Sequence, residues 1–120
     1  MLIVSEPVLA EIFPAFRGQD ELQEFLLRTG VRFEPSTLEA LERAGAAWSR
    51  YRDERGTDFL CQNCGATQPL SCSRCSSTVK TRQHLMTDFL IGAHAVTQAD
   101  RLMTRDRGYF STYFPDLNII

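Results

Sequence analysis

The chain has 120 residues, of which 43% are hydrophobic and 23% are charged, as in an ordinary soluble globular domain. Its formal net charge of -2 excludes a general attraction for nucleic acid, so an RNA partner would have to bind local basic patches. No apolar run reaches the roughly 18 residues that cross a bilayer, and residues 1–16 carry Glu6, Glu11 and two prolines, unlike a secretory signal. We therefore expect a cytoplasmic protein with no membrane partner.

The first third of the chain predicts strands that alternate with helices. Residues 1–4 are an apolar run of strand character, and Ser5 is placed to cap the helix that follows. A second amphipathic helix covers residues 20–29 and ends at Gly30, a residue type that readily adopts the left-handed conformation. Residues 31–33 then predict a short strand.

The longest predicted helix begins at a capping box formed by Ser36 and Glu39 and continues to about Arg55. Its apolar face is predicted to include Leu38, Leu41, Ala44 or Gly45, Trp48 and Tyr51. Basic residues gather near its end at Arg50, Arg52 and Arg55. They suit the negative end of the helix dipole, and contact with RNA phosphates is the alternative interpretation.

The last third of the chain continues the alternation. Thr87 is predicted to cap a helix that begins at Asp88, and residues 101–104 are predicted to form a short strand. A loop containing Gly108 follows, and the apolar residues 117–120 predict a last buried strand. Strands that alternate with helices predict the α/β class, with a parallel sheet flanked by helices.

Three acids stand at positions where parallel strands bring ligands together. Glu11 lies on the helix after the first strand, Asp88 opens the helix before the predicted strand 101–104, and Asp106 follows that strand. We expect these carboxylates to meet at one edge of the sheet and to need a hard cation, Mg²⁺ or Mn²⁺. The alternative for Asp88 and Asp106 is a helix cap or an ordinary surface acid.

These segments resemble a known family. Residues 88–95 (DFLIGAHA) and 99–106 (ADRLMTRD), with Tyr109-Phe110 and the closing strand 117–120, resemble the second half of a PIN domain of the VapC toxin type. Residues 4–11 (VSEPVLAE) resemble the second strand of that family and its following helix. The resemblance covers residues 1–55 and 84–120.

The resemblance implies a metal-dependent endoribonuclease that hydrolyses phosphodiester bonds of structured RNA such as tRNA or rRNA. It implies that the chain is the toxin of a VapBC-type pair, which a cognate antitoxin inhibits and which can form a homodimer. Glu11, Asp88 and Asp106 take the catalytic, metal-binding positions, and Thr104 supplies a hydroxyl beside them. The first strand of the family, which carries a leading Asp, has no counterpart within residues 1–120, so we expect a single PIN-like domain that is N-terminally incomplete.

Four cysteines fall within fifteen residues as Cys61-x2-Cys64-x7-Cys72-x2-Cys75, inside a polar insert at residues 57–83. The insert has too few apolar residues to fold around its own core, and paired cysteines in a chain without an export signal predict a tetrahedral structural Zn²⁺ site. Redox pairs or plain reduced thiols are the alternatives.

The insert is locally basic through Arg74, Lys80 and Arg82, and it leads directly into the acidic helix. It either contacts RNA or the antitoxin, or acts only as a structural clamp. We expect His84 to lie outside the zinc shell and His94 to be a packed histidine rather than a catalyst. The alternative to a nuclease is a catalytically inactive module that binds nucleic acid or protein through the zinc knuckle.

Overall fold

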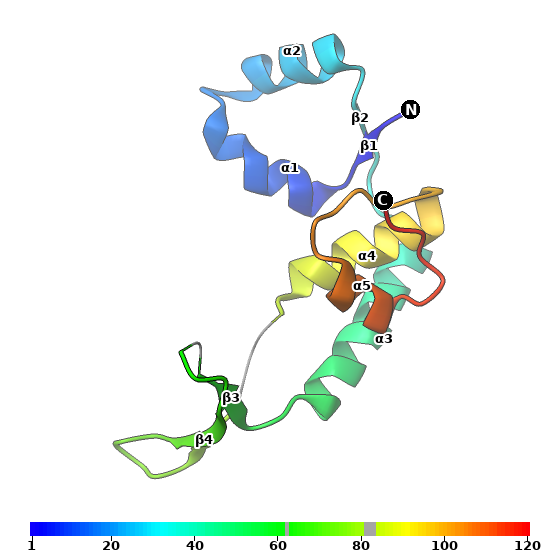
Figure 1. Cartoon of the computed structure of the whole chain (residues 1–120). Helices are drawn as coiled ribbons and strands as arrows, with labels where there is room; N and C mark the ends of the chain where they lie inside the picture. Colours follow the sequence, from blue (N-terminus) through cyan, green and yellow to red (C-terminus); the bar gives the residue numbers. More distant parts are fainter. Residues whose placement is uncertain (62, 81–83) are drawn as a thin grey trace.

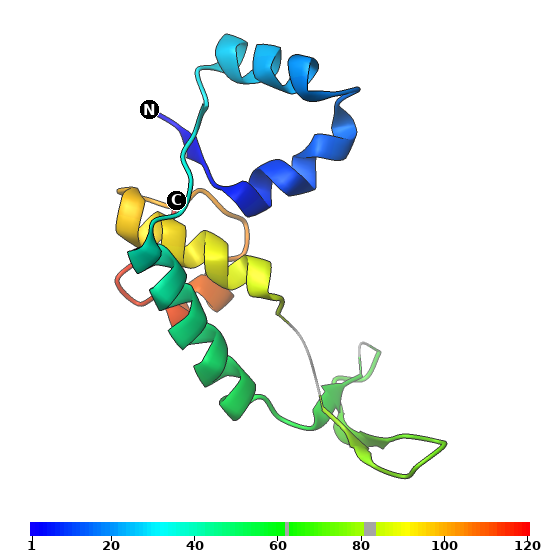
Figure 2. The ribbon, with the colours of Figure 1, turned by 180° about the vertical axis from the view of Figure 1, so that it is seen from behind.

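The computed structural model describes residues 1–61, 63–80 and 84–120 of a mixed α/β chain. Three parts follow one another in Figures 1 and 2: an N-terminal lobe (residues 1–33), a helical body (residues 38–54 and 86–120) and a β arm (residues 58–79). The radius of gyration is 17.7 Å, whereas a compact domain of this length has about 14 Å. The lobe and the arm therefore extend from the body. None of the described helices combines the length and the apolar content that a membrane crossing requires.

The N-terminal lobe contains, in chain order, β1 (Ile3–Val4), α1 (Glu6–Ile12), the 3-10 turn η1 (Phe13–Ala15), α2 (Gln19–Thr29) and β2 (Arg32–Phe33). The two strands pair in parallel, with Ile3 opposite Arg32 and Val4 opposite Phe33. Gly30 ends α2 with a φ of 70°, a conformation that a side chain would strain. The predicted alternation of strands and helices in this part is confirmed.

A hydrogen-bonded clasp joins the lobe to the body. The carboxylate of Glu6 accepts two hydrogen bonds of 2.8 Å from Ser36, one from its backbone N–H and one from its hydroxyl. The predicted N-cap at Ser36 is therefore wrong, because its hydroxyl is committed to Glu6. The N-cap is Thr37, whose Oγ1 accepts from the N–H of Ala40 at 3.2 Å.

The helical body is built from α3 (Leu38–Glu54), α4 (Met86–Gln98) and α5 (Arg107–Tyr113). Its buried core consists of Ala44, Ala47, Tyr51, Phe89, Ala93, Tyr109, Phe110 and Phe114. The predicted apolar face of α3 is wrong at Leu38 and Leu41, which are 85% and 44% exposed. Alanines take the buried positions instead, and these small side chains leave room for the fully buried Phe89 of α4.

The start of α4 and the segment after it also differ from expectation. Thr87 is not the cap, because α4 begins at Met86 and Leu85 is its N-cap. The backbone N–H of Leu85 donates to Oδ2 of Asp88 at 2.9 Å, so Asp88 closes the first turn from inside the helix. The predicted loop around Gly108 is the helix α5.

The expected strands 101–104 and 117–120 are reduced to one parallel bridge between Leu102 and Ile119. The N–H of Leu102 donates to the carbonyl of Asn118 at 2.8 Å, and the N–H of Ile120 donates back to Leu102 at 2.9 Å. Ile120 is 48% exposed rather than buried. Among the described residues, this bridge and the β1–β2 pair are separate and do not join into one parallel sheet.

The β arm is an antiparallel sheet with the strand order β3-β4-β5, formed by β3 (Asp58–Leu60), β4 (Thr67–Ser71) and β5 (Thr78–Val79). It lies inside the predicted insert 57–83 and projects from the end of α3, away from the helices (Figures 1 and 2). Every residue of β4 is exposed. The arm therefore has little core of its own.

Candidate functional site

Several residues predicted for the acidic site gather around Tyr109 on α5. Oγ1 of Thr104 accepts a hydrogen bond of 3.1 Å from the backbone N–H of Asp106. Asp106 is the N-cap of α5, and its Oδ1 accepts from the N–H of Tyr109 at 3.4 Å. Thr104 thus holds the backbone of Asp106, and Asp106 in turn caps the helix that carries Tyr109.

Asp88 approaches the same tyrosine from α4. Its Oδ2 lies 3.9 Å from Nδ1 of His84, and the His84 ring lies against the Tyr109 ring with 4.1 Å between the centroids. The backbone N–H of His84 donates to the hydroxyl of Tyr51 at 3.2 Å. We call His84, Asp88, Thr104, Asp106 and Tyr109 the Tyr109 cluster. Sequence reasoning missed His84, although its position four residues before Asp88 was the available signal.

The hydroxyl of Tyr109 is the unusual group of this cluster. The side chain is 7% exposed, and its hydroxyl is buried with no hydrogen-bond partner among the described residues. Burial raises the pKa of Tyr109, and the charges of Asp88 and Asp106 raise that pKa further. The cluster therefore holds a neutral, unsatisfied hydroxyl within electrostatic reach of two carboxylates.

Glu11 does not join the cluster. It is exposed on α1, and among the described residues no hydrogen bond or ion pair links it to Asp88 or Asp106. Nor do any three described His, Cys, Asp or Glu side chains gather closely enough to hold a metal ion. Mg²⁺ is commonly held by one or two carboxylates with water completing the shell, so Asp88 and Asp106 are the residues here whose chemistry fits Mg²⁺ or Mn²⁺.

His94 has a structural environment, as expected. Its side chain is 4% exposed, and its Nε2 lies 2.8 Å from the carbonyl oxygen of Glu34. Gln98, one turn further along α4, donates to the carbonyl of Pro35 at 2.9 Å. These contacts attach α4 to the segment that follows the N-terminal lobe.

The first cysteine pair lies in the turn between β3 and β4. The N–H of Cys61 donates to the carbonyl of Ala66 at 2.8 Å, and the N–H of Gly65 donates back to Cys61 at 2.9 Å. Gly65 has a φ of 74°, which explains the glycine after the second cysteine. Backbone hydrogen bonds from Cys64 and Asn63 lower the pKa of the Cys61 thiol and so favour the thiolate.

The second pair, between β4 and β5, repeats this geometry. The N–H of Cys72 donates to the carbonyl of Ser77 at 2.8 Å, and the N–H of Ser76 donates back to Cys72 at 2.8 Å. Ser76 has a φ of 62° at the position equivalent to the glycine of the first turn. Hydrogen bonds from Ser77 lower the pKa of the Cys75 thiol. We call the two turns knuckle 1 (the described residues 61 and 63–66) and knuckle 2 (residues 72–77).

The knuckles stand at opposite ends of β4, because one turn leads into this strand and the other leaves it in an antiparallel sheet. All four cysteines are free thiols. Five extended residues span about 17 Å, whereas the sulfur atoms of one tetrahedral zinc shell lie about 4 Å apart. Each pair therefore fits half of a zinc shell, and the two pairs of one chain do not fit a single shell in this structure.

The basic residues of the insert are only partly described. Arg74 and Lys80 are exposed on the arm, and Arg82 lies outside the described residues. On α3, Arg50 stacks over the Tyr113 ring at 5.0 Å and donates to the carbonyl of Thr112. Arg50 therefore packs against α5.

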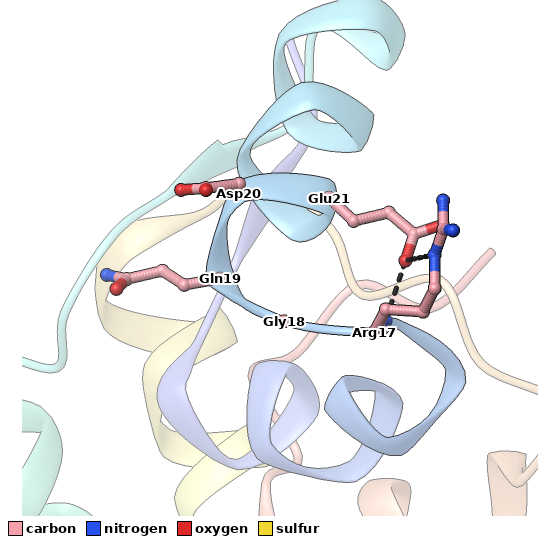
Figure 3. A pocket seen from close by; sticks show the side chains of 5 residues that line it. All are labelled: Arg17, Gly18, Gln19, Asp20 and Glu21. Carbon is pink, nitrogen blue, oxygen red and sulfur yellow. Dashed lines mark hydrogen bonds and ion pairs between the residues drawn. The ribbon is translucent and has the colours of Figure 1, made fainter.

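A shallow hollow of about 440 Å³ lies at the start of α2 and is drawn in Figure 3. Its lining includes Gly18 and Asp20, together with Arg17 and Glu21. The Glu21 carboxylate accepts from the backbone N–H of Arg17 at 2.6 Å and from its Nε at 3.3 Å. The Glu21 carboxylate is thus paired with the Arg17 side chain that lines the same hollow.

No protein family, no curated protein and no solved structure matches this chain.

Proposed function

We propose that the chain is a metal-dependent endoribonuclease, the toxin of a VapBC-type pair, with a PIN-like fold. The observation that carries this proposal is that both acids lie beside Tyr109: Asp106 caps the helix of Tyr109, and Asp88 lies beside His84, whose ring packs on the Tyr109 ring. Both acids are among the residues that the resemblance singles out. Glu11 belongs to the metal-binding set by resemblance alone.

In the proposed reaction, bound Mg²⁺ or Mn²⁺ would supply an activated water and offset the charge that grows on the RNA phosphate. Asp88 and Asp106 are the carboxylates that would hold the cation. Thr104 orients Asp106 through its backbone, and His84 lies beside the Asp88 carboxylate. Tyr109 is protonated at neutral pH, and its buried hydroxyl is a donor that has no partner among the described residues and lies near the two acids.

The proposed substrate is a structured RNA of the tRNA or rRNA class, and the proposed partner is a cognate antitoxin in the cytoplasm. Arg74 and Lys80 support RNA contact, since both are exposed on the projecting arm. We also propose structural Zn²⁺ at the cysteines. The support is the repeated turn geometry and the lowered pKa of Cys61 and Cys75, because zinc binds the thiolate form.

The deciding experiment is cleavage of a mixed tRNA and rRNA pool by the purified chain in Mg²⁺ or Mn²⁺, beside an EDTA control. Asp88→Asn and Asp106→Asn should each reduce the rate by roughly 100-fold or more while the fold is kept. Asp20→Asn is the matched control, because Asp20 is also an acid in the first turn of a helix but lies outside the cluster. Cleavage that persists in EDTA, or in both cluster variants, would contradict the proposal.

The alternative function is a catalytically inactive module that binds RNA or protein through the zinc arm. The separation of Glu11 from Asp88 and Asp106 favours it, because the three predicted carboxylates do not share a contact. This module would retain a labelled RNA without cutting it. Its binding would survive Asp88→Asn and would be lost when the cysteines are replaced by serine.

A further inference from the structure

We propose that two copies of this chain share zinc between their β arms, knuckle 1 of each copy closing a four-thiolate shell with knuckle 2 of the other. This inference rests on the zinc binding put forward above. It goes beyond that binding because it names the source of the missing ligands.

Neither knuckle has enough ligands to complete a zinc shell by itself. Each knuckle brings two thiols together, and structural zinc takes four ligands. The nearest other pair of the same chain stands at the far end of β4, and the described part of the chain contains no group of three His, Cys, Asp or Glu that could complete a shell. The missing half of each shell must therefore come from another molecule.

The two knuckles match each other in geometry. Knuckles 1 and 2 have the same hydrogen-bond pattern and a positive φ at the same place, at Gly65 and Ser76. Consider a two-fold axis that lies between the copies, perpendicular to β4 and level with its middle. It sets the two β4 strands antiparallel, so knuckle 1 of one copy meets knuckle 2 of the other at both ends. Both zinc shells are completed at the same time, because the two knuckles are separated by the same distance in each copy.

Two paired β arms would also cover an exposed apolar surface. Leu70 and Val79 are opposite each other in the β4–β5 register and are 42% and 38% exposed. Three short strands whose central strand is exposed along its whole length are marginally stable alone. The arm also projects from the helical body, so a second arm can reach it (Figures 1 and 2). A second copy would thus bury these side chains and bind the metal in one event.

The test combines metal content with mass in solution, using the full chain in a reducing buffer with Zn²⁺ as the probe. The expected result is a dimer by light scattering that holds one zinc per chain and becomes monomeric when a chelator removes the metal. A chain that binds no zinc contradicts the zinc proposal itself. A monomer that holds one zinc leaves zinc binding intact and overturns the shared site.

Two variants give the sharper measurement. The first carries Cys61→Ser with Cys64→Ser, and the second carries Cys72→Ser with Cys75→Ser. Alone, each should lack a four-thiolate site, whereas their equimolar mixture should form a heterodimer with one zinc per two chains. Cobalt in place of zinc reports the number of thiolates through its sulfur-to-metal absorption. A mixture that binds no better than its components overturns the proposal, as does a single variant that forms the site by itself. Ser73→Ala, within knuckle 2 but outside the thiols, is the control.

Discussion

The ring of His84 lies against the ring of Tyr109, with 4.1 Å between the centroids and 31° between the ring planes. His84 follows the β arm in the chain, and Tyr109 belongs to the helix that Asp106 caps. The contact therefore places His84, the first described residue after the arm, beside the proposed acidic site. His84 also lies beside Asp88, with 3.9 Å between Nδ1 and Oδ2.

Replacing Tyr109 by Phe separates stability from activity. Tyr109→Phe removes a buried, unpartnered hydroxyl, so we expect the free energy of unfolding to rise by about 1 kcal/mol. We expect RNA cleavage to fall, because the hydroxyl is the available donor beside the two acids. Urea unfolding and the cleavage assay measure the two effects. Tyr113→Phe, on the same helix, is the control, and unchanged cleavage by Tyr109→Phe would remove the hydroxyl from the proposed site.

The same hydroxyl predicts a loss of stability in alkali. Because the pKa of Tyr109 is raised in the folded chain, the fold favours the protonated form. That contribution is complete below the unfolded pKa of about 10 and is lost as the pH rises above it. The free energy of unfolding should therefore fall less steeply above about pH 10 in Tyr109→Phe than in the natural chain. Parallel pH profiles of the two proteins would argue against this environment.

Asp106 has two roles that different substitutions separate. Asp106→Ala removes the N-cap of α5 and should lower the free energy of unfolding by about 1 kcal/mol. Asp106→Asn keeps a capping oxygen and should cost only a few tenths of a kcal/mol. Both should abolish RNA cleavage, because both remove the charge. If Asp106→Asn cleaves RNA normally, Asp106 is a cap and not a metal ligand.

Gly92 is required by the packing of α4 against Phe114. A Cβ at position 92 would overlap the Phe114 ring, which is 2% exposed and has little room to move. Gly92→Ala gains helix propensity of about 1 kcal/mol but overpacks the core, so we expect a net loss of about 1 to 2 kcal/mol in unfolding free energy. Gly45→Ala meets no atom within 4 Å and should be stabilising by about 0.5 to 1 kcal/mol. Equal effects of the two changes in urea unfolding would contradict this packing.

The clasp between Glu6 and Ser36 predicts a loss of stability in acid. Burial raises the pKa of Glu6, but the hydrogen bonds from Ser36 together outweigh it and leave that pKa below its usual value. The contribution of the clasp is present above the unfolded pKa and is lost as the pH falls through the lower, folded pKa. Glu6→Gln should therefore flatten the acid side of the stability profile. Glu24→Gln, at an exposed position of α2, should leave that profile unchanged.

Local signals in the sequence predicted much of the secondary structure. Gly30 was expected to end a helix in the left-handed conformation, and it does so with a φ of 70°. Pairing between distant segments was predicted less well. Ser36 was assigned to a cap because of its spacing from Glu39, but the distant Glu6 competes for its hydroxyl. The helix α5 was missed. The available signal was Asp106, because aspartate is a preferred N-cap and its carboxylate here accepts from the N–H of Tyr109, three residues later.

The sequence by itself determined the local conformations: the helices with their stops, and two cysteine turns of the same form. Those features depend on residues within a few positions of one another, whose preferences act before the chain folds. Only the tertiary structure decided which groups meet. It brings Asp88 and Asp106 to Tyr109, leaves Glu11 apart and sets the two knuckles at opposite ends of β4. These meetings depend on helix packing and strand pairing between distant segments, which spacing along the chain does not encode.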